Sequence, residues 1–107
     1  MEVWLTGPDG KPDHAGTGPP VGFAYEAFAR IFHADGAPGR LGWFSRLGDF
    51  YRDARFGASE VDGLLRDLRR RREELAAARS LHGSLDALID LVERAVDADR
   101  GLALEAD

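Results

Sequence analysis

The sequence predicts an α+β domain in which a small sheet, containing the first and last strands of the chain, packs against three helices. Residues 2–6 and 102–104 alternate between apolar and other side chains, which is typical of short strands. Segments at about 21–33, 60–79 and 85–98 carry apolar residues at spacings of three and four, which is typical of amphipathic helices. The 107 residues fit a single domain, residues 1–107.

The first predicted strand is half-buried, because its two sides differ. One side carries Val3 and Leu5, and the other carries Glu2, Trp4 and Thr6. Residues 7–20 follow, with four glycines and four prolines, and are predicted to be a loop. Fourteen residues make a long loop for a domain of this size, so we expect it to be either mobile or functional.

The three predicted helices have recognisable boundaries. The first ends before Gly36 and Pro38. Ser59 is the predicted N-cap of the second helix, and Ser84 that of the third. Because only a short break at residues 80–83 separates these two helices, we expect them to be antiparallel neighbours. Their predicted apolar stripes are Val61, Leu64, Leu65, Leu68 and Leu75, interrupted by Arg72, and then Leu85, Leu88, Ile89, Val92, Ala95 and Val96.

Residues 40–57, RLGWFSRLGDFYRDARFG, combine five of the ten aromatic residues with interleaved arginines. Two interpretations remain open: a buried connector, or a partly exposed patch with the composition enriched at protein interfaces. The candidate partner-binding residues are Trp43, Arg46, Tyr51, Arg52 and Arg55. We expect Phe50 and Phe56 to be buried against the second long helix, with Trp43 or Tyr51 exposed.

Charge is unevenly distributed along the chain. The net charge is −5, but residues 40–79 hold ten arginines against seven acidic residues, so that segment is +3 and the rest is −8. The run of arginines from Arg69 to Arg72 is the best candidate for a nucleic-acid contact. On a helix, however, these side chains point in four directions, and Glu73 and Glu74 lie four residues after Arg69 and Arg70. A solvated helix face is therefore the preferred interpretation.

No catalytic or metal-binding pattern is recognisable in the sequence. His14, His33 and His82 lie far apart and form no HExxH or HxxxH spacing. None of the four serines lies in a GxSxG motif, and the glycine-rich segments lack the phosphate-loop and dinucleotide patterns. We therefore expect a protein that is not an enzyme and that has no cofactor and no metal.

The chain contains no cysteine, which excludes disulfides and thiolate metal sites. Its N-terminus, MEVWLTGPDGK, lacks the basic and then apolar pattern of a signal peptide. No apolar run approaches the ~20 residues that a membrane-spanning helix needs. The expected location is the cytoplasm, with no membrane contact.

Three segments carry a resemblance to known proteins: GFAYEAFARIF, LGWFSRLGDFYRDARFGASEVDGLLRDL and LDALIDLVERAVDADRGLALEA. Their layout resembles small uncharacterised bacterial α+β proteins, some of which are similar to the immunity proteins encoded beside secreted toxins. The resemblance implies a non-enzymatic protein-binding module, an immunity-like inhibitor whose partner is a toxin. The alternatives are an arginine-mediated nucleic-acid or regulatory binder, and a small enzyme with an unrecognised site. A homo-oligomer remains open.

Overall fold

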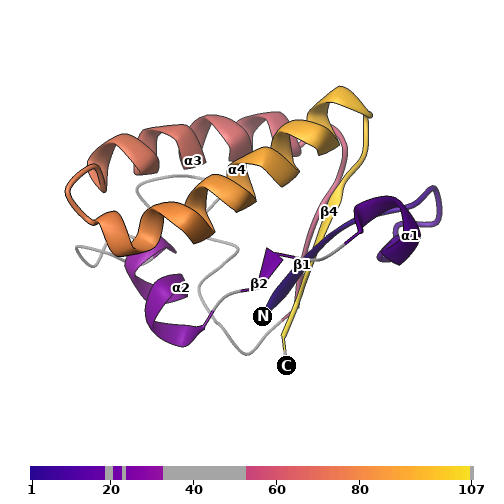
Figure 1. The fold of residues 1–107 in the computed structure, drawn as a ribbon. Coiled ribbons are helices and arrows are strands. Elements are labelled where there is room, and N and C mark those ends of the chain that lie inside the picture. Colours follow the sequence, from indigo (N-terminus) through magenta and orange to yellow (C-terminus); the bar gives the residue numbers. More distant parts are fainter. Residues whose placement is uncertain (19–20, 23, 33–52, 107) are drawn as a thin grey trace.

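A four-stranded antiparallel sheet forms one layer of the structure, a computed structural model that describes residues 1–18, 21–22, 24–32 and 53–106. The strands are β1 (Glu2–Leu5), β2 (Val21–Gly22), β3 (Ala54–Phe56) and β4 (Leu102–Glu105), in the spatial order β2–β1–β4–β3. β1 pairs with β4 along its whole length, from Glu2 opposite Glu105 to Leu5 opposite Leu102. The sheet therefore contains the first and last strands of the chain, as the sequence predicts, and the structure places them side by side at its centre (Figure 1).

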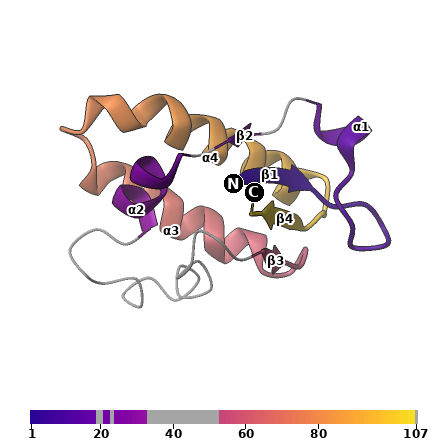
Figure 2. The ribbon, with the colours of Figure 1, turned by 90° about the horizontal axis from the view of Figure 1, so that it is seen from below.

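The described helices are divided between the two sides of the sheet. α2 (Tyr25–Phe32), α3 (Val61–Glu74) and α4 (His82–Asp97) lie on one side, and the short α1 (His14–Thr17) lies on the other (Figure 1). A 3₁₀ turn at Arg79–Leu81 leads from α3 into α4, which pack side by side as an antiparallel pair (Figure 2). The predicted α+β class is thus confirmed.

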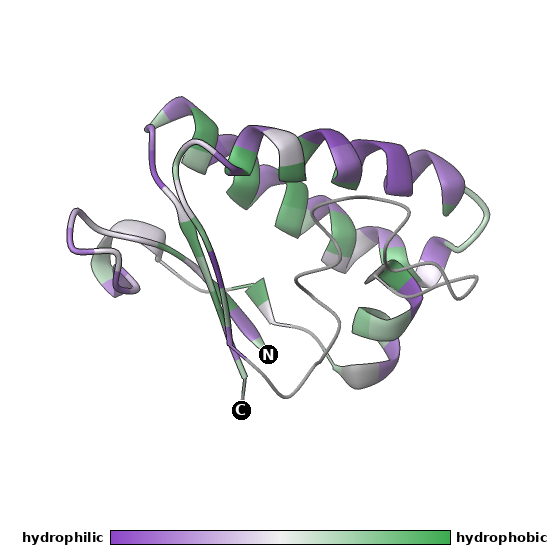
Figure 3. Ribbon diagram, turned by 180° about the vertical axis from the view of Figure 1, so that it is seen from behind, coloured by the Kyte–Doolittle hydropathy of each residue, from purple (hydrophilic) through white to green (hydrophobic). Residues whose placement is uncertain are grey.

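The core lies between the sheet and α2, α3 and α4. Val3, Leu5, Leu102 and Leu104 are buried on the sheet side, and the apolar faces of the long helices turn towards them (Figure 3). The predicted stripes are confirmed from Val61 to Leu68 and from Leu85 to Ala95, since their large aliphatic residues are all buried. Each such side chain contributes about 1.5–3 kcal/mol when fully buried.

The start of the predicted first helix is wrong. Val21 and Gly22 form β2, which pairs with β1 through Val21 opposite Val3, and the helix itself begins at Tyr25. Val21 fits the helical spacing, but as a strand residue it pairs with the edge of β1 and still packs against the core. Two further elements, β3 and α1, are absent from the sequence prediction; α1 lies inside the predicted loop at residues 7–20.

Both predicted serine caps are wrong. α3 begins after Glu60, whose side chain makes no cap bond to the helix and instead accepts a hydrogen bond from the Gly57 N–H at 2.8 Å. α4 already begins at His82, so Ser84 lies within its first turn. The 3₁₀ turn runs directly into this helix, which removes the need for a serine cap at that point. α3 also ends at Glu74, earlier than the predicted residue 79.

Arg71, and not Arg72, is the charged residue that enters the core side of α3. It is 6% exposed, and its Nε and Nη2 donate hydrogen bonds to the carbonyl oxygens of Ile31 and Arg30, each at 2.8 Å. Those carbonyls belong to the last turn of α2, where helical partners are missing. Arg71 therefore caps the C-terminal end of α2 from the neighbouring helix, and Glu74 lies 3.2 Å from its Nη1.

The neighbouring arginines hold α3 against α4. The Arg72 Nε donates to the Asp86 Oδ1 at 2.7 Å, and the Arg69 Nη2 lies 3.4 Å from the Glu93 Oε1. Arg69 therefore contacts α4 in place of its predicted partner Glu73, and Glu74 contacts Arg71 in place of its predicted partner Arg70. The Arg72 guanidinium holds the pKa of the Asp86 carboxyl below its usual range, mainly by direct hydrogen bonding.

Candidate binding surface

The face of the sheet opposite the core, here called the outer face, consists of Glu2, Trp4, Arg55, Ala103 and Glu105. Their register follows from strand pairing, since Ala103 lies opposite Trp4 on one side and opposite Arg55 on the other. Ala103 is fully buried, Trp4 is partly exposed, and Glu2 and Arg55 are exposed. Of these five residues, Trp4 therefore supplies the accessible apolar surface of the outer face, beside the charged Glu2, Arg55 and Glu105.

Trp4 is held in place by α1. Its ring packs against the His14 ring with the centroids 4.2 Å apart and the planes tilted by 32°. α1 is tied to β1 by Thr17, whose hydroxyl accepts a hydrogen bond from the Leu5 N–H at 2.9 Å and donates one to the Asp13 carbonyl at 2.7 Å. A four-residue helix is not stable by itself, so these contacts fix the position of His14 over Trp4.

A charged pair strengthens the same attachment. The Asp13 carboxylate caps α1 by accepting a hydrogen bond from the Gly16 N–H at 2.9 Å, and it also contacts the Arg100 Nη1 at 2.9 Å. The Gly16 N–H, followed by Arg100, holds the pKa of Asp13 below its ordinary value of 3.8. Arg94 on α4 donates hydrogen bonds to the last carbonyls of α1, those of Gly16 and Thr17. α1 is thus connected both to α4 and to the turn that leads from α4 into β4.

Arg55 is the one predicted partner-binding residue that lies within the described residues. It extends from the edge strand β3, and its side chain is 45% exposed. The Arg55 Nη2 lies 3.7 Å from the Glu105 Oε2, and the Nη1 donates to the Ala54 carbonyl at 3.2 Å. Exposed ion pairs at this distance contribute little to stability, so the guanidinium can exchange its present neighbours for another partner.

The other predicted partner-binding residues, Trp43, Arg46, Tyr51 and Arg52, lie outside the described residues, as do Phe50 and His33. The burial of Phe56 is confirmed, since it is 2% exposed within the main core. The two flanks of the segment that carries these residues are described. Arg71 caps the preceding helix α2, and after the segment the Asp53 Oδ1 accepts a hydrogen bond from the Ala106 N–H at 2.8 Å.

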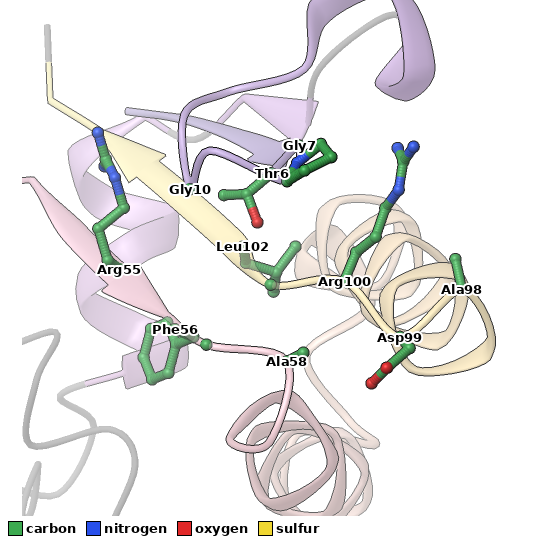
Figure 4. A pocket seen from close by; sticks show the side chains of 13 residues that line it. Thr6, Gly7, Gly10, Arg55, Phe56, Ala58, Ala98, Asp99, Arg100 and Leu102 are labelled. Atoms are coloured by element: carbon green, nitrogen blue, oxygen red, sulfur yellow. The ribbon is translucent and has the colours of Figure 1, made fainter.

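A cavity of about 560 Å³ adjoins Arg55 at one end of the sheet. Three turns surround it: the turn after β1, the turn between β3 and α3, and the turn between α4 and β4 (Figure 4). Arg55 and Arg100 border it on different sides, with Thr6 and Leu102 between them (Figure 4).

Gly101 brings two of these turns together. A Cβ at this position would collide with the Phe56 carbonyl oxygen and would lie 2.9 Å from the Thr6 Oγ1. The Thr6 N–H donates to the Gly101 carbonyl at 3.0 Å, which extends the pairing of β1 and β4 by one residue. The close approach that forms this end of the cavity therefore requires glycine.

Each of the two described histidines contacts another part of the fold. His14 packs on Trp4, and the His82 Nε2 lies 2.9 Å from the Leu75 carbonyl oxygen, just beyond the end of α3. Within the described residues, no group of three or more histidine or acidic side chains could hold a metal ion. No helix in that part of the chain is long and apolar enough to cross a membrane.

Comparison of the chain with known protein families, with curated protein sequences and with solved structures gives no match. Sequence reasoning did not select Trp4 as a binding residue. The available signal was its place beside Glu2 and Thr6, on the polar side of an alternating strand, where a large aromatic residue is unusual.

Proposed function

We propose that this chain is a non-enzymatic protein-binding module that docks through its outer face, and that it acts as an immunity-like inhibitor of a bacterial toxin. The observation that carries the proposal is the placement of Trp4 and Arg55 on either side of the small residue Ala103. Tryptophan and arginine are the residue types most enriched among the energetically important residues of protein interfaces.

The arrangement of the outer face supports this function. Interfaces commonly combine an apolar centre with a polar rim, and on the outer face Trp4 is next to the Glu2–Glu105 pair and in the same row as Arg55. Because α1 and Thr17 fix the position of Trp4, little side-chain entropy would be lost when a partner covers it. Trp43, Arg46, Tyr51 and Arg52 remain predicted contacts, in a segment that leads directly into the edge strand β3.

Charge supports a basic partner. The chain carries −5 overall, and the acidic residues of α4 recur at spacings of four, three and four, which places them along one side of the helix. They are Asp86, Asp90, Glu93 and Asp97, of which Asp86 and Glu93 contact Arg72 and Arg69 of α3. A field of this sign accelerates association with a positively charged protein, particularly at low ionic strength.

The arginine-mediated nucleic-acid alternative has less support. Arg69 and Arg72 contact acidic residues of α4, and Arg71 is buried against the end of α2. A phosphate would have to displace these contacts, because counterion release requires arginines that are free to pair with the backbone. Arg66 and Arg70 are exposed on α3. Together they form only a small cationic surface in a chain of net negative charge.

Co-expression with the product of the adjacent gene tests the proposed function. The expected result is a stoichiometric complex that survives gel filtration and protects cells from the toxicity of that product. The control variant Glu73→Ala changes an exposed residue of α3, away from the outer face, and should protect cells as well as the unchanged chain does. A monodisperse chain that binds no neighbouring gene product, and that gives no protection, would contradict the proposal.

A further inference from the structure

The cavity at the end of the sheet has a fixed shape, because each of its walls is held by a backbone N–H that donates a hydrogen bond. The Gly7 N–H donates to the Lys11 carbonyl at 2.9 Å, the Thr6 N–H to the Gly101 carbonyl at 3.0 Å, and the Gly57 N–H to the Glu60 carboxylate at 2.8 Å. Its volume of about 560 Å³ is within the range of pockets that bind small molecules, so it has room for a side chain of a partner. The site is therefore largely preformed.

The lining is apolar apart from a few polar groups. The aliphatic surface that a ligand can contact is that of Pro8, Ala58 and Ala98, while Phe56 and Leu102 border the cavity with side chains that are buried in the core. Glycines in all three turns leave the interior free of side chains. Such a lining favours an apolar side chain over a charged one as the group that enters.

Arg55 is the cation at this site that is available to a ligand. Arg100 also lines the cavity, but its Nη1 is held 2.9 Å from the Asp13 carboxylate, which caps α1. The Glu105 carboxylate, which contacts Arg55, is 3.7 Å away, beyond hydrogen-bond distance, and its side chain is 36% exposed. An incoming carboxylate could form the paired N–H···O bonds that Glu105 does not make.

Asp99 lies on a different side of the cavity from Arg55 (Figure 4). The cavity therefore has a negatively charged group on one side and a positively charged group on another. Asp99 has a φ of 55°, and it follows α4 at the position where helices commonly end with glycine in the left-handed conformation. The Arg100 N–H donates to the Ala95 carbonyl and the Asp99 N–H to the Val96 carbonyl, which is the usual double hydrogen bond of such helix ends. A carboxylate here repels acidic groups, so an acidic ligand would approach from the side of Arg55.

We infer that this cavity receives an apolar side chain of the partner protein, and that an acidic residue next to it in the partner binds Arg55. The inference rests on the proposed function and adds the chemistry of the partner's contact segment. Arg55 belongs both to the outer face and to the cavity, so one partner can cover the two surfaces continuously. The positive charge of the partner as a whole governs its approach, whereas this contact concerns one local carboxylate.

Titration of the isotopically labelled full chain with short blocked peptides tests the inference without the partner. The probe is acetyl-leucyl-glutamyl amide, and its controls replace the glutamyl group by glutaminyl or the leucyl group by alanyl. The amide signals of Gly57, Gly101 and Asp99 should shift and saturate at millimolar peptide. Each control should bind at least about threefold more weakly, because it lacks the charge-assisted bonds or the apolar group.

Arg55→Gln should remove the preference for the glutamyl over the glutaminyl peptide. Arg66→Gln, at an exposed position on α3 outside the cavity lining, should preserve it. Equal binding of the two peptides to the unchanged chain would overturn the inference, as would unmoved Gly57 and Gly101 signals at about 10 mM peptide. Either result leaves the docking of Trp4 on the partner intact, since that contact is measured separately with the partner and the Trp4→Ala variant.

Discussion

The two faces of the sheet differ sharply, although the same strands form both. In β1, Val3 and Leu5 turn to the helices and are buried, whereas Glu2 and Trp4 turn away and stay exposed or partly exposed. In β4, likewise, Leu104 is buried on the inner face and Glu105 is partly exposed on the outer face. Adjacent residues therefore differ in role: the inner face contributes most of the stability, and the outer face carries the contact with a partner that we propose.

The largest expected loss of stability comes from a substitution on the inner face of the sheet. Leu104→Ala removes a side chain that is 1% exposed at the centre of the core, and we expect it to lower the free energy of unfolding by about 3 to 5 kcal/mol. Glu105→Ala, one residue further along β4 and on the outer face, should change it by less than about 1 kcal/mol. Urea denaturation of both variants measures the contrast. Similar losses would show that the two faces do not divide their roles in this way.

A second contrast concerns two consecutive arginines of α3. Arg71→Ala should lower the free energy of unfolding by about 2 to 4 kcal/mol, because it leaves the Arg30 and Ile31 carbonyls without their donors. Arg70→Ala, at an exposed position, should change it by less than about 0.5 kcal/mol. Arg71→Lys should not restore the loss, because an ammonium group cannot reproduce the fork of the guanidinium. Thermal denaturation distinguishes these variants, and equal effects of the two alanine substitutions would contradict the capping role of Arg71.

Gly101 lies at the end of the sheet, against Phe56 and Thr6. Its replacement should lower the free energy of unfolding. Gly101→Ala places a methyl group against the Phe56 carbonyl, and we expect a loss of about 2 to 3 kcal/mol as the strands move apart. Gly83→Ala is the matched control, since α4 leaves open space at that exposed position. It should stabilise the chain by up to about 1 kcal/mol through helix propensity. A tolerated Gly101→Ala would show that the close approach is not required.

The smallest effect depends on pH and concerns the attachment of α1 to the outer layer. Since the pKa of Asp13 is lowered in the folded chain, its ionised form stabilises the fold above its ordinary pKa of 3.8, and this contribution is lost as the pH falls below that value. Asp13→Asn keeps a capping side chain but loses the charge opposite Arg100. Between pH 5 and pH 2.5, roughly the range in which that carboxyl titrates, the melting temperature of the variant should therefore fall less than that of the unchanged chain. Parallel falls would exclude Asp13 as a source of acid sensitivity.

The parts of the fold that the sequence predicts are those with local periodicity. The stripes of α3 and α4 follow from spacings of three and four, and the alternation of Val3 and Leu5 identifies β1. β3 has three residues and acquires its identity from β4, a strand almost fifty residues later in the chain. Val21 fits either a helix or a strand, and its pairing with Val3 decides between them.

The candidate site was less accessible to sequence reasoning. The composition of residues 40–57 drew attention to Arg55, but no local pattern placed it level with Trp4, which lies fifty-one residues earlier. The role of Arg71 had the same difficulty, because its acceptors are carbonyls of another helix, forty and forty-one residues away. Contacts between elements depend on tertiary packing, which periodicity within one element does not encode.

The affinity of the Trp4→Ala variant for the partner protein tests the central claim most directly. The unfolding free energy should be measured alongside it, so that a loss of binding can be separated from a loss of folding. If Trp4 anchors the interface, the variant should remain folded and bind at least about tenfold more weakly, whereas Glu73→Ala should bind as the unchanged chain does. An unchanged affinity in a folded Trp4→Ala variant would contradict the assignment of the outer face as the docking surface.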